Sequence, residues 1–330
     1  MKRVIDVCEN SINRDDVHMM IQCDKCAKCR TCRDIRKINA FSYNDFVEQQ
    51  AMEQLVEFVE GKDGKPGFFT SPLPLKPFNI NSVKSNRITA DEQNRRMLER
   101  LQTDPEALKQ IKEEMESLQR AGFIAKLEDM PEEVQKRLND DIKHFIPTSI
   151  AYKETSASTK CRICWDSSRS SRESNSLNSI LLKGTSEYSV VKMLVRFREN
   201  KIGISADIRK FYNTLRLDPS HYKYHMALWR PNVQPDEAAI ELVLLVHFYG
   251  IRSSGGLCMA AVKKLIEFAR RLKLENVAKV LESAYVDDCN SSVGTENELE
   301  ELKEKMPQFM LDHGMPIKAL AWSGSETPTE

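Results

Sequence analysis

The chain has 330 residues, of which 41% are hydrophobic and 30% charged, so it is long enough to form two lobes or one large α/β unit with a substantial core. It contains no apolar run of 18 or more residues and no charged n-region followed by an apolar h-region, so we expect a soluble, unsecreted protein. Nine cysteines, an odd number, favour reduced thiols or metal ligands over a disulfide framework.

The 49 basic and 49 acidic residues are unevenly distributed along the chain. Residues 181–230 include ten Lys or Arg against four Asp or Glu, a net charge of plus six that suits contact with the phosphate backbone of a nucleic acid. Residues 281–330 include three Lys against eleven Asp or Glu, a net charge of minus eight. The balanced total therefore does not exclude a nucleic-acid-binding protein.

The N-terminal segment, residues 1–60, contains four cysteines separated by uniform two-residue gaps, namely Cys23, Cys26, Cys29 and Cys32. Four thiolates at one place can bind a tetrahedral Zn²⁺ ion. The two Cys pairs of ordinary zinc ribbons lie about 15 to 20 residues apart, however, and Arg33 stands where the ferredoxin pattern requires Pro. A zinc site, a weaker iron–sulfur alternative and a reduced linker without metal all remain open.

Helical and strand patterns follow the turn-rich residues 61–67. Apolar residues recur at helical spacing between positions 98 and 118, with a break near Asp104 and Pro105. This stripe predicts helices that pack into the core, and we assign its residues no catalytic or binding role. The patterns after residue 186 then predict, in chain order, a helix to about 199, a strand at 202–208, a hairpin at 224–246, a helix at about 256–273 and a helix at 295–312. We therefore expect three segments, with boundaries 1–60, 61–185 and 186–330.

Three carboxylates near these predicted strands indicate a candidate metal-binding or catalytic site. Asp287 and Asp288 follow Tyr285 and Val286 at an expected strand-to-strand turn, where they are either an ordinary solvated turn or a pair facing a divalent cation. Asp207, 80 residues before Asp287, ends a buried apolar strand. Burial of a charged carboxylate costs free energy unless the group is paired or bound to metal. Together the three can hold two Mg²⁺ ions, one activating a primer 3′-hydroxyl and the other holding a triphosphate during phosphoryl transfer.

Several further blocks accompany these carboxylates in a fixed order. The set comprises the Cys cluster, 144–147 (HFIP), 159–168 (TKCRICWDSS), 176–178 (SLN) with 182–184 (LKG), 207–214 (DIRKFYNT), 228–230 (LWR) and 285–288 (YVDD). On these blocks the chain resembles the reverse transcriptase region of a BEL/Pao-type LTR retrotransposon Pol polyprotein, over nearly its whole length. The resemblance implies an α+β fold of the right-hand polymerase type, with fingers in 61–185 and a palm in 186–330 whose antiparallel sheet is backed by helices.

The resemblance also implies an activity and the residues that carry it. The activity is RNA-directed DNA polymerisation with two Mg²⁺ ions, held by Asp207, Asp287 and the backbone carbonyl of Ile208. Asp288 completes the acidic box, and Tyr285 and Val286 form its turn. Tyr212, five positions after Asp207, would lie under the incoming sugar and exclude a 2′-hydroxyl, although an ordinary core tyrosine is the alternative reading.

Four further residues are implied in nucleotide binding. Arg162 would grip the triphosphate through bidentate hydrogen bonds and Lys160 would assist, although a solvated strand charge is the plain alternative. Phe211 departs from the family pattern, which has a small residue beside the nucleotide pocket, and would crowd that pocket. Gly250 lies in the expected template loop, where Ser253 stands near the position of the family's Pro and additional glycines predict a more flexible loop.

The expected partners follow from the same resemblance. They are a primer on an RNA or DNA template, deoxynucleoside triphosphates (dNTPs), and the protease, RNase H and integrase domains of a parent polyprotein, with no membrane. The chain stops shortly after Trp322, so we expect the thumb to be absent and the chain to be an excised piece or a truncated insertion. The alternative is an inactive retrotransposon remnant that at most binds nucleic acid. We expect a cytoplasmic location, within element particles if the parent element is active.

Overall fold

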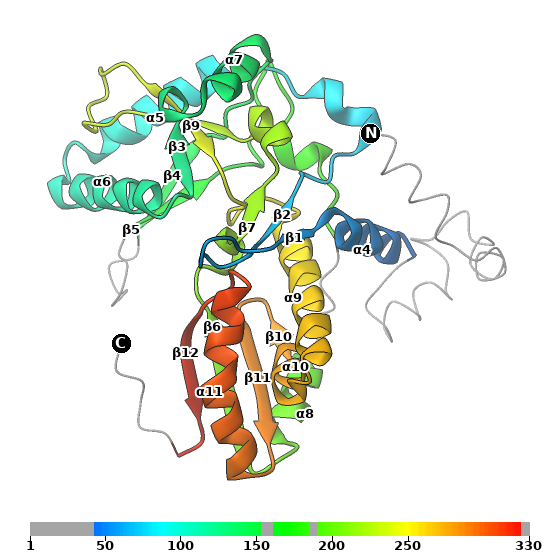
Figure 1. The fold of residues 1–330 in the computed structure, drawn as a ribbon. Helices are drawn as coiled ribbons and strands as arrows, with labels where there is room; N and C mark the ends of the chain where they lie inside the picture. Colours follow the sequence, from blue (N-terminus) through cyan, green and yellow to red (C-terminus); the bar gives the residue numbers. More distant parts are fainter. Residues whose placement is uncertain (1–42, 153–160, 185–189, 325–330) are drawn as a thin grey trace, which may run out of the picture.

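The computed structural model describes residues 43–152, 161–184 and 190–324, which form an upper and a lower lobe (Figure 1). The described residues are a mixture of helices and four small sheets. None of the helices among them is long and apolar enough to cross a bilayer.

The lower lobe is built on a four-stranded antiparallel sheet with the order β10-β11-β6-β12 (Figure 1). Its strands are β6 (Ile202–Ile208), β10 (Ala284–Tyr285), β11 (Asp288–Val293) and β12 (Ile317–Trp322). Helices α10 (Glu275–Leu281) and α11 (Glu296–Asp312) contact its strands, and α9 (Ser254–Arg271) packs against α10 and shares their core. Alternate residues of β6, Ile204, Ala206 and Ile208, are buried in the same core cluster as these helices, so one face of the sheet is sealed from water.

The opposite face of this sheet is only partly covered, by α8 (Val190–Arg198). Gly203 lets the ring of Phe197 approach, because a Cβ at residue 203 would lie 2.9 Å from the Phe197 ring. The Ser292 hydroxyl donates to the carbonyl of Arg196 at 2.6 Å. Since α8 contacts the end of the sheet at Gly203 and Ser292, the end that carries Asp207 is left accessible.

In the described part of the chain, the upper lobe contains two sheets and three α-helices (Figure 1). Its helices are α5 (Arg87–Leu101), α6 (Pro105–Arg120) and α7 (Glu132–Asp140). Its strands are β3 (Ile124–Lys126), β9 (Ile240–Leu244) and β8 (Met226–Trp229) in one sheet, and β4 (Thr148–Tyr152) with β5 (Cys161–Trp165) in the other. A third sheet, β1 (Glu57–Val59), β2 (Phe68–Ser71) and β7 (Leu215–Leu217), lies where the lobes meet, beside α4 (Tyr43–Leu55).

Most of the elements expected from periodicity are confirmed. The apolar stripe from 98 to 118 is core, and the break within it is the start of α6, where the Asp104 carboxylate accepts from the backbone N–H of Ala107 at 2.9 Å. The helices expected at 186–199, 256–273 and 295–312 correspond to α8, α9 and α11, and the hairpin to β8 and β9. No element was expected at α10 or at β12, which are short and gain their stability from packing on the sheet.

Two hydrophobic cores, one in each lobe, draw on segments from both sides of residue 186. The upper core joins residues between Leu73 and Leu181 to residues between Leu217 and Ile251. The lower core contains Phe69 together with β6 and all residues from Leu257 onward that are buried and apolar. Each lobe is therefore discontinuous in sequence, and the division of the chain at 60 and 185 stays a prediction.

Candidate active site

The open end of the lower sheet brings together the three carboxylates that the sequence singled out. In the pairing of β11 with β6, Asp288 stands directly opposite Asp207. Asp287 lies in the two-residue turn between β10 and β11, where Val286 has a left-handed backbone with φ of 63°. The backbone N–H of Ile208 donates to the carbonyl of Asp287 at 2.9 Å, which ties this turn to β6.

These carboxylates influence one another electrostatically. Burial raises the pKa of Asp207, the charge of Asp287 raises it further, and Lys318 lowers it. The pKa of Asp288 is likewise raised by burial, then by Asp287 and by Asp207. Lys318 Nζ lies 3.9 Å from Asp207 Oδ2. The site is thus a cluster of negative charge that favours a cation.

The donor set suits magnesium in its chemistry but is incomplete by itself. Among the residues that the structure describes, no group of three or more His, Cys, Asp or Glu side chains is arranged around one metal position. Magnesium in proteins uses one or two carboxylates and takes its other ligands from water and substrate phosphates. Asp207, Asp287 and Asp288 fit that partial role, and the two-ion site with the Ile208 carbonyl stays a prediction.

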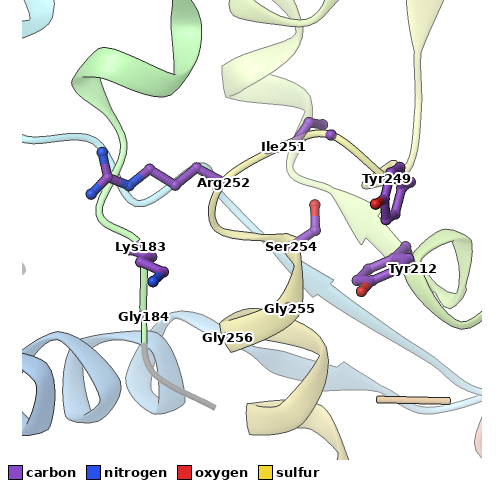
Figure 2. A pocket seen from close by; sticks show the side chains of 10 residues that line it. Lys183, Gly184, Tyr212, Tyr249, Ile251, Arg252, Ser254, Gly255 and Gly256 are labelled. Atoms are coloured by element: carbon purple, nitrogen blue, oxygen red, sulfur yellow. The ribbon is translucent and has the colours of Figure 1, made fainter. Parts of the chain in front are cut away.

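A cavity of about 240 Å³ is bordered by the 3-10 helix that follows β6 and by the first turn of α9 (Figure 2). Its lining consists of Lys183, Gly184, Tyr212, Tyr249, Gly250, Ile251, Arg252, Ser254, Gly255 and Gly256. The basic side chains of Lys183 and Arg252 lie on one side of the cavity, and the rings of Tyr212 and Tyr249 lie on the other, 5.9 Å apart and edge to face (Figure 2). The cavity therefore combines positive charge with aromatic surface.

Tyr212 connects this cavity with the carboxylates. It lies on the 3-10 helix Phe211–Thr214, which follows Lys210 in a left-handed conformation with φ of 49°. Burial raises the pKa of the Tyr212 hydroxyl, and the charges of Cys258, Asp287 and Tyr249 raise it further. Since Asp287 acts on Tyr212, the aromatic wall of the cavity lies within electrostatic reach of the acidic turn.

The loop at Gly250 is held in place rather than flexible, which corrects the sequence-based expectation. Gly250 has φ of 97°, and a Cβ there would lie 2.7 Å from the carbonyl oxygen of Trp165. The side chain of Asn178 bonds to the backbone of both Gly250 and Arg252 at 2.8 Å. The additional glycines belong to the first turn of α9, where Gly256 approaches Gly184 closely. Backbone hydrogen bonding and helix packing therefore remove the freedom that the glycines suggested.

The other residues expected at the site are placed as follows. Phe211 is 3% exposed and belongs to the lower core, where its carbonyl accepts from Cys258, and it is not among the residues that line the cavity. Arg162 is exposed on β5, opposite Ala151, and does not line the cavity either. Lys160 and the Cys23–Cys32 cluster lie outside the described residues. Tyr285 pairs with Asp288 across the turn.

Sequence reasoning assigned no role to several residues that the structure places here. Lys183, Tyr249 and Arg252 line the cavity, Asn178 fixes its loop, and Lys318 contacts Asp207. The signal for Asn178 and Lys183 was their position in the blocks that carry the resemblance, and the signal for Tyr249 and Arg252 was their place beside Gly250 in the expected template loop. No sequence signal marks Lys318, because its place depends on how β12 pairs with β6.

Comparisons with known proteins give only distant similarity. No protein-family model matches the sequence, and no curated protein matches it. Among solved structures, the chain is similar to a foamy viral protease-reverse transcriptase in complex with double-stranded DNA, with 16% identity and a TM-score of 0.45 over 66% of this chain and 32% of that one. It is also similar to a Prototype Foamy Virus protease-reverse transcriptase mutant, with 17% identity and a TM-score of 0.45 over 65% of this chain and 24% of that one. The chain thus spans less than a third of the length of either structure.

Proposed function

We propose that the chain is the core of a template-directed DNA polymerase that transfers nucleotides to a primer 3′-hydroxyl. The observation that carries this proposal is the register of β6 and β11, in which Asp207 and Asp288 are direct neighbours with Asp287 in the adjoining turn. Carboxylates gathered at one open sheet end are what a two-metal phosphoryl transfer requires. In this reading the lower sheet with its helices is the palm, and the upper lobe contributes the fingers.

The carboxylates would bind metal, and the residues that line the cavity would bind the nucleotide. Asp207, Asp287 and Asp288 would hold Mg²⁺, which when bound supplies activation of the attacking hydroxyl and stabilises the leaving pyrophosphate. Lys183 and Arg252 supply positive charge for phosphate groups. The rings on the opposite wall of the cavity supply an apolar surface for a sugar or base.

The finer assignments extend this proposal. Tyr212 would select deoxynucleotides by occupying the space of a 2′-hydroxyl, and Arg162 would grip the triphosphate from the fingers. An RNA template, the BEL/Pao type of the parent element, its other Pol domains and a cytoplasmic location rest on the ordered sequence blocks. The basic residues around β6, including Lys201, Arg209 and Lys210, favour contact with a nucleic-acid backbone.

Primer extension tests the proposal. The purified full chain is incubated with Mg²⁺, dNTPs and a primer on an RNA or a DNA template, and Asp287→Asn is compared with Asp236→Asn, an exposed residue in the loop between β8 and β9. We expect extension by the wild type and by Asp236→Asn, and a loss of at least about 100-fold in Asp287→Asn, because the metal contribution is worth several kcal/mol.

Two results would contradict the proposal that the chain is a polymerase. Equal incorporation by the wild type and Asp287→Asn would show that the acidic turn is not catalytic. Salt-sensitive binding to the primed templates by both proteins, with no incorporation on either template, would instead support the inactive nucleic-acid-binding remnant.

A further inference from the structure

The pairing of β12 with β6 contains a β-bulge beside Asp207. Ile317 stands opposite Ile208 and Ala319 stands opposite Asp207, so Lys318 is an extra residue on β12. A bulge places two residues of one strand against a single residue of its partner and re-aims a side chain, and bulges recur next to active sites. The bulge here therefore bears directly on the carboxylate that the proposed function requires.

The neighbours of the bulge show where the Lys318 side chain is directed. Ile317 and Leu320 pack against the lower core, on the face of the sheet that α10 and α11 cover. Ala319 stands opposite Asp207 on the other face, which α8 covers only in part and which we call the open face. Lys318 Nζ reaches to 3.9 Å from Asp207 Oδ2. The small side chain of Ala319 leaves room for this approach. The bulge thus brings an ammonium group to the open face at the position of a carboxylate.

The charges around Asp207 give this contact a role. Asp288 stands opposite Asp207 in the strand register and Asp287 lies in the adjoining turn, so the Asp207 carboxylate has two like charges as neighbours, and Lys318 Nζ brings a positive charge to 3.9 Å from it. The Lys318 and Asp207 side chains are 57% and 38% exposed, so the pair is solvated and weak. A weak pair of this kind can be exchanged for a stronger cation at little cost.

We propose that Lys318 is a positioning residue that serves as an internal counter-cation for Asp207, and that a divalent cation displaces its ammonium group when it binds. This inference rests on the proposed metal-binding role of the three carboxylates. It adds that Lys318 opposes metal binding at Asp207, and that it offsets the negative charge of this carboxylate when no metal is present.

Binding of Mn²⁺ to the full chain, measured by the electron paramagnetic resonance signal of free Mn²⁺ at low salt, tests the displacement. We expect Lys318→Gln to bind Mn²⁺ about 2- to 5-fold more tightly than the wild type, the range that an exposed ion pair supports. Lys318→Arg keeps the charge and should not bind more tightly. Lys273→Gln, an exposed lysine in the turn between α9 and α10, makes the same charge change away from Asp207 and should leave the affinity unchanged.

A second readout uses thermal unfolding. The rise in Tm on adding Mn²⁺ should be larger in Lys318→Gln than in the wild type, because tighter binding to the folded state adds stability. If Lys318→Gln binds Mn²⁺ no more tightly than Lys273→Gln, the counter-cation role is wrong. In that case loss of Mn²⁺ binding in Asp207→Asn would still support the metal site. If the wild type itself binds no Mn²⁺, the proposed metal site and this inference both fail.

Discussion

Asn178 and Gly250, 72 residues apart in the chain, are joined by a hydrogen bond of 2.8 Å from Asn178 Nδ2 to the Gly250 carbonyl. The Oδ1 atom of the same side chain accepts from the backbone N–H of Arg252, also at 2.8 Å. One amide therefore satisfies a donor and an acceptor on the loop that forms one wall of the cavity. This contact fixes Arg252 and Tyr249 relative to the 3-10 helix that carries Asn178.

Removal of the Asn178 amide should loosen this wall. We expect Asn178→Ala to lower the free energy of unfolding by about 1 to 3 kcal/mol, because two hydrogen bonds to the loop backbone are lost. Asn139→Ala, an exposed asparagine on α7, is the control and should change stability by less than about 0.5 kcal/mol. Urea unfolding measures both, and equal effects would mean that the amide does not secure the loop.

Two glycines in the cavity wall should respond oppositely to alanine. Gly250→Ala should destabilise the protein by more than about 1 kcal/mol, since φ is 97° and a Cβ would meet the carbonyl oxygen of Trp165. Gly255→Ala should be neutral or stabilising by up to about 1 kcal/mol, because the first turn of α9 has open space at this position. Urea unfolding of the two variants provides the comparison. Similar losses in both would contradict the structure of this loop.

The acidic cluster should cost stability at neutral pH. Burial, Asp287 and Asp207 raise the pKa of Asp288 above 3.8, so its ionised form opposes folding as the pH rises from 3.8 through the raised value. We therefore expect Asp288→Asn to be more stable than the wild type at about pH 7 in low salt without divalent cations. The gain should vanish near pH 3, where the carboxyl is protonated in both states.

Urea unfolding across this pH range measures the effect, with Asp236→Asn as the control for removal of a negative charge. A gain of the same size at pH 3 and pH 7 would show that the charge of Asp288 is not its cause. Under the proposed function, Asp288→Asn should also reduce primer extension, so the more stable protein would be the less active one.

Tyr212 should control the choice of sugar if the proposed function holds. Its ring lies between Phe211 and Tyr249, at centroid distances of 5.5 and 5.9 Å, and borders the cavity. Tyr212→Ala should raise kcat/KM for ribonucleotides relative to deoxynucleotides by at least about 10-fold, whereas Tyr212→Phe keeps the ring and should leave the ratio unchanged. Single-nucleotide incorporation on a primed template provides both ratios. An unchanged ratio of the two kcat/KM values in Tyr212→Ala would indicate that Tyr212 has only a structural role.

Local signals allowed the main elements after residue 186 to be predicted. The helix at 295–312 is α11, whose start is fixed by the capping box of Thr295 and Glu298. The strand at 202–208 is β6, whose apolar residues alternate toward the core. The short elements α10 and β12 escaped prediction because their stability comes from contacts with the sheet rather than from their own sequence.

The glycine-rich segment after Phe248 shows where local reasoning fails. Glycines increase the freedom of an isolated chain, and the sequence therefore predicted a flexible loop. In the folded protein Gly250 is required by a positive φ and by the nearby carbonyl of Trp165, and Gly256 by the close approach of Gly184. The same residues that loosen an unfolded chain permit tight packing once distant segments are present.

Local patterns along the chain identified the chemical groups and their settings, namely a carboxylate at the end of an apolar strand and two more in a tight turn. The folded arrangement of the strands was needed to show that Asp288 faces Asp207 and that Lys318 reaches the same carboxylate. The reason is that strand register joins segments far apart in the chain, and a slip of one residue moves every side chain to the opposite face of the sheet. Residue types along a chain specify what a site can do, while the pairing of strands decides which residues share it.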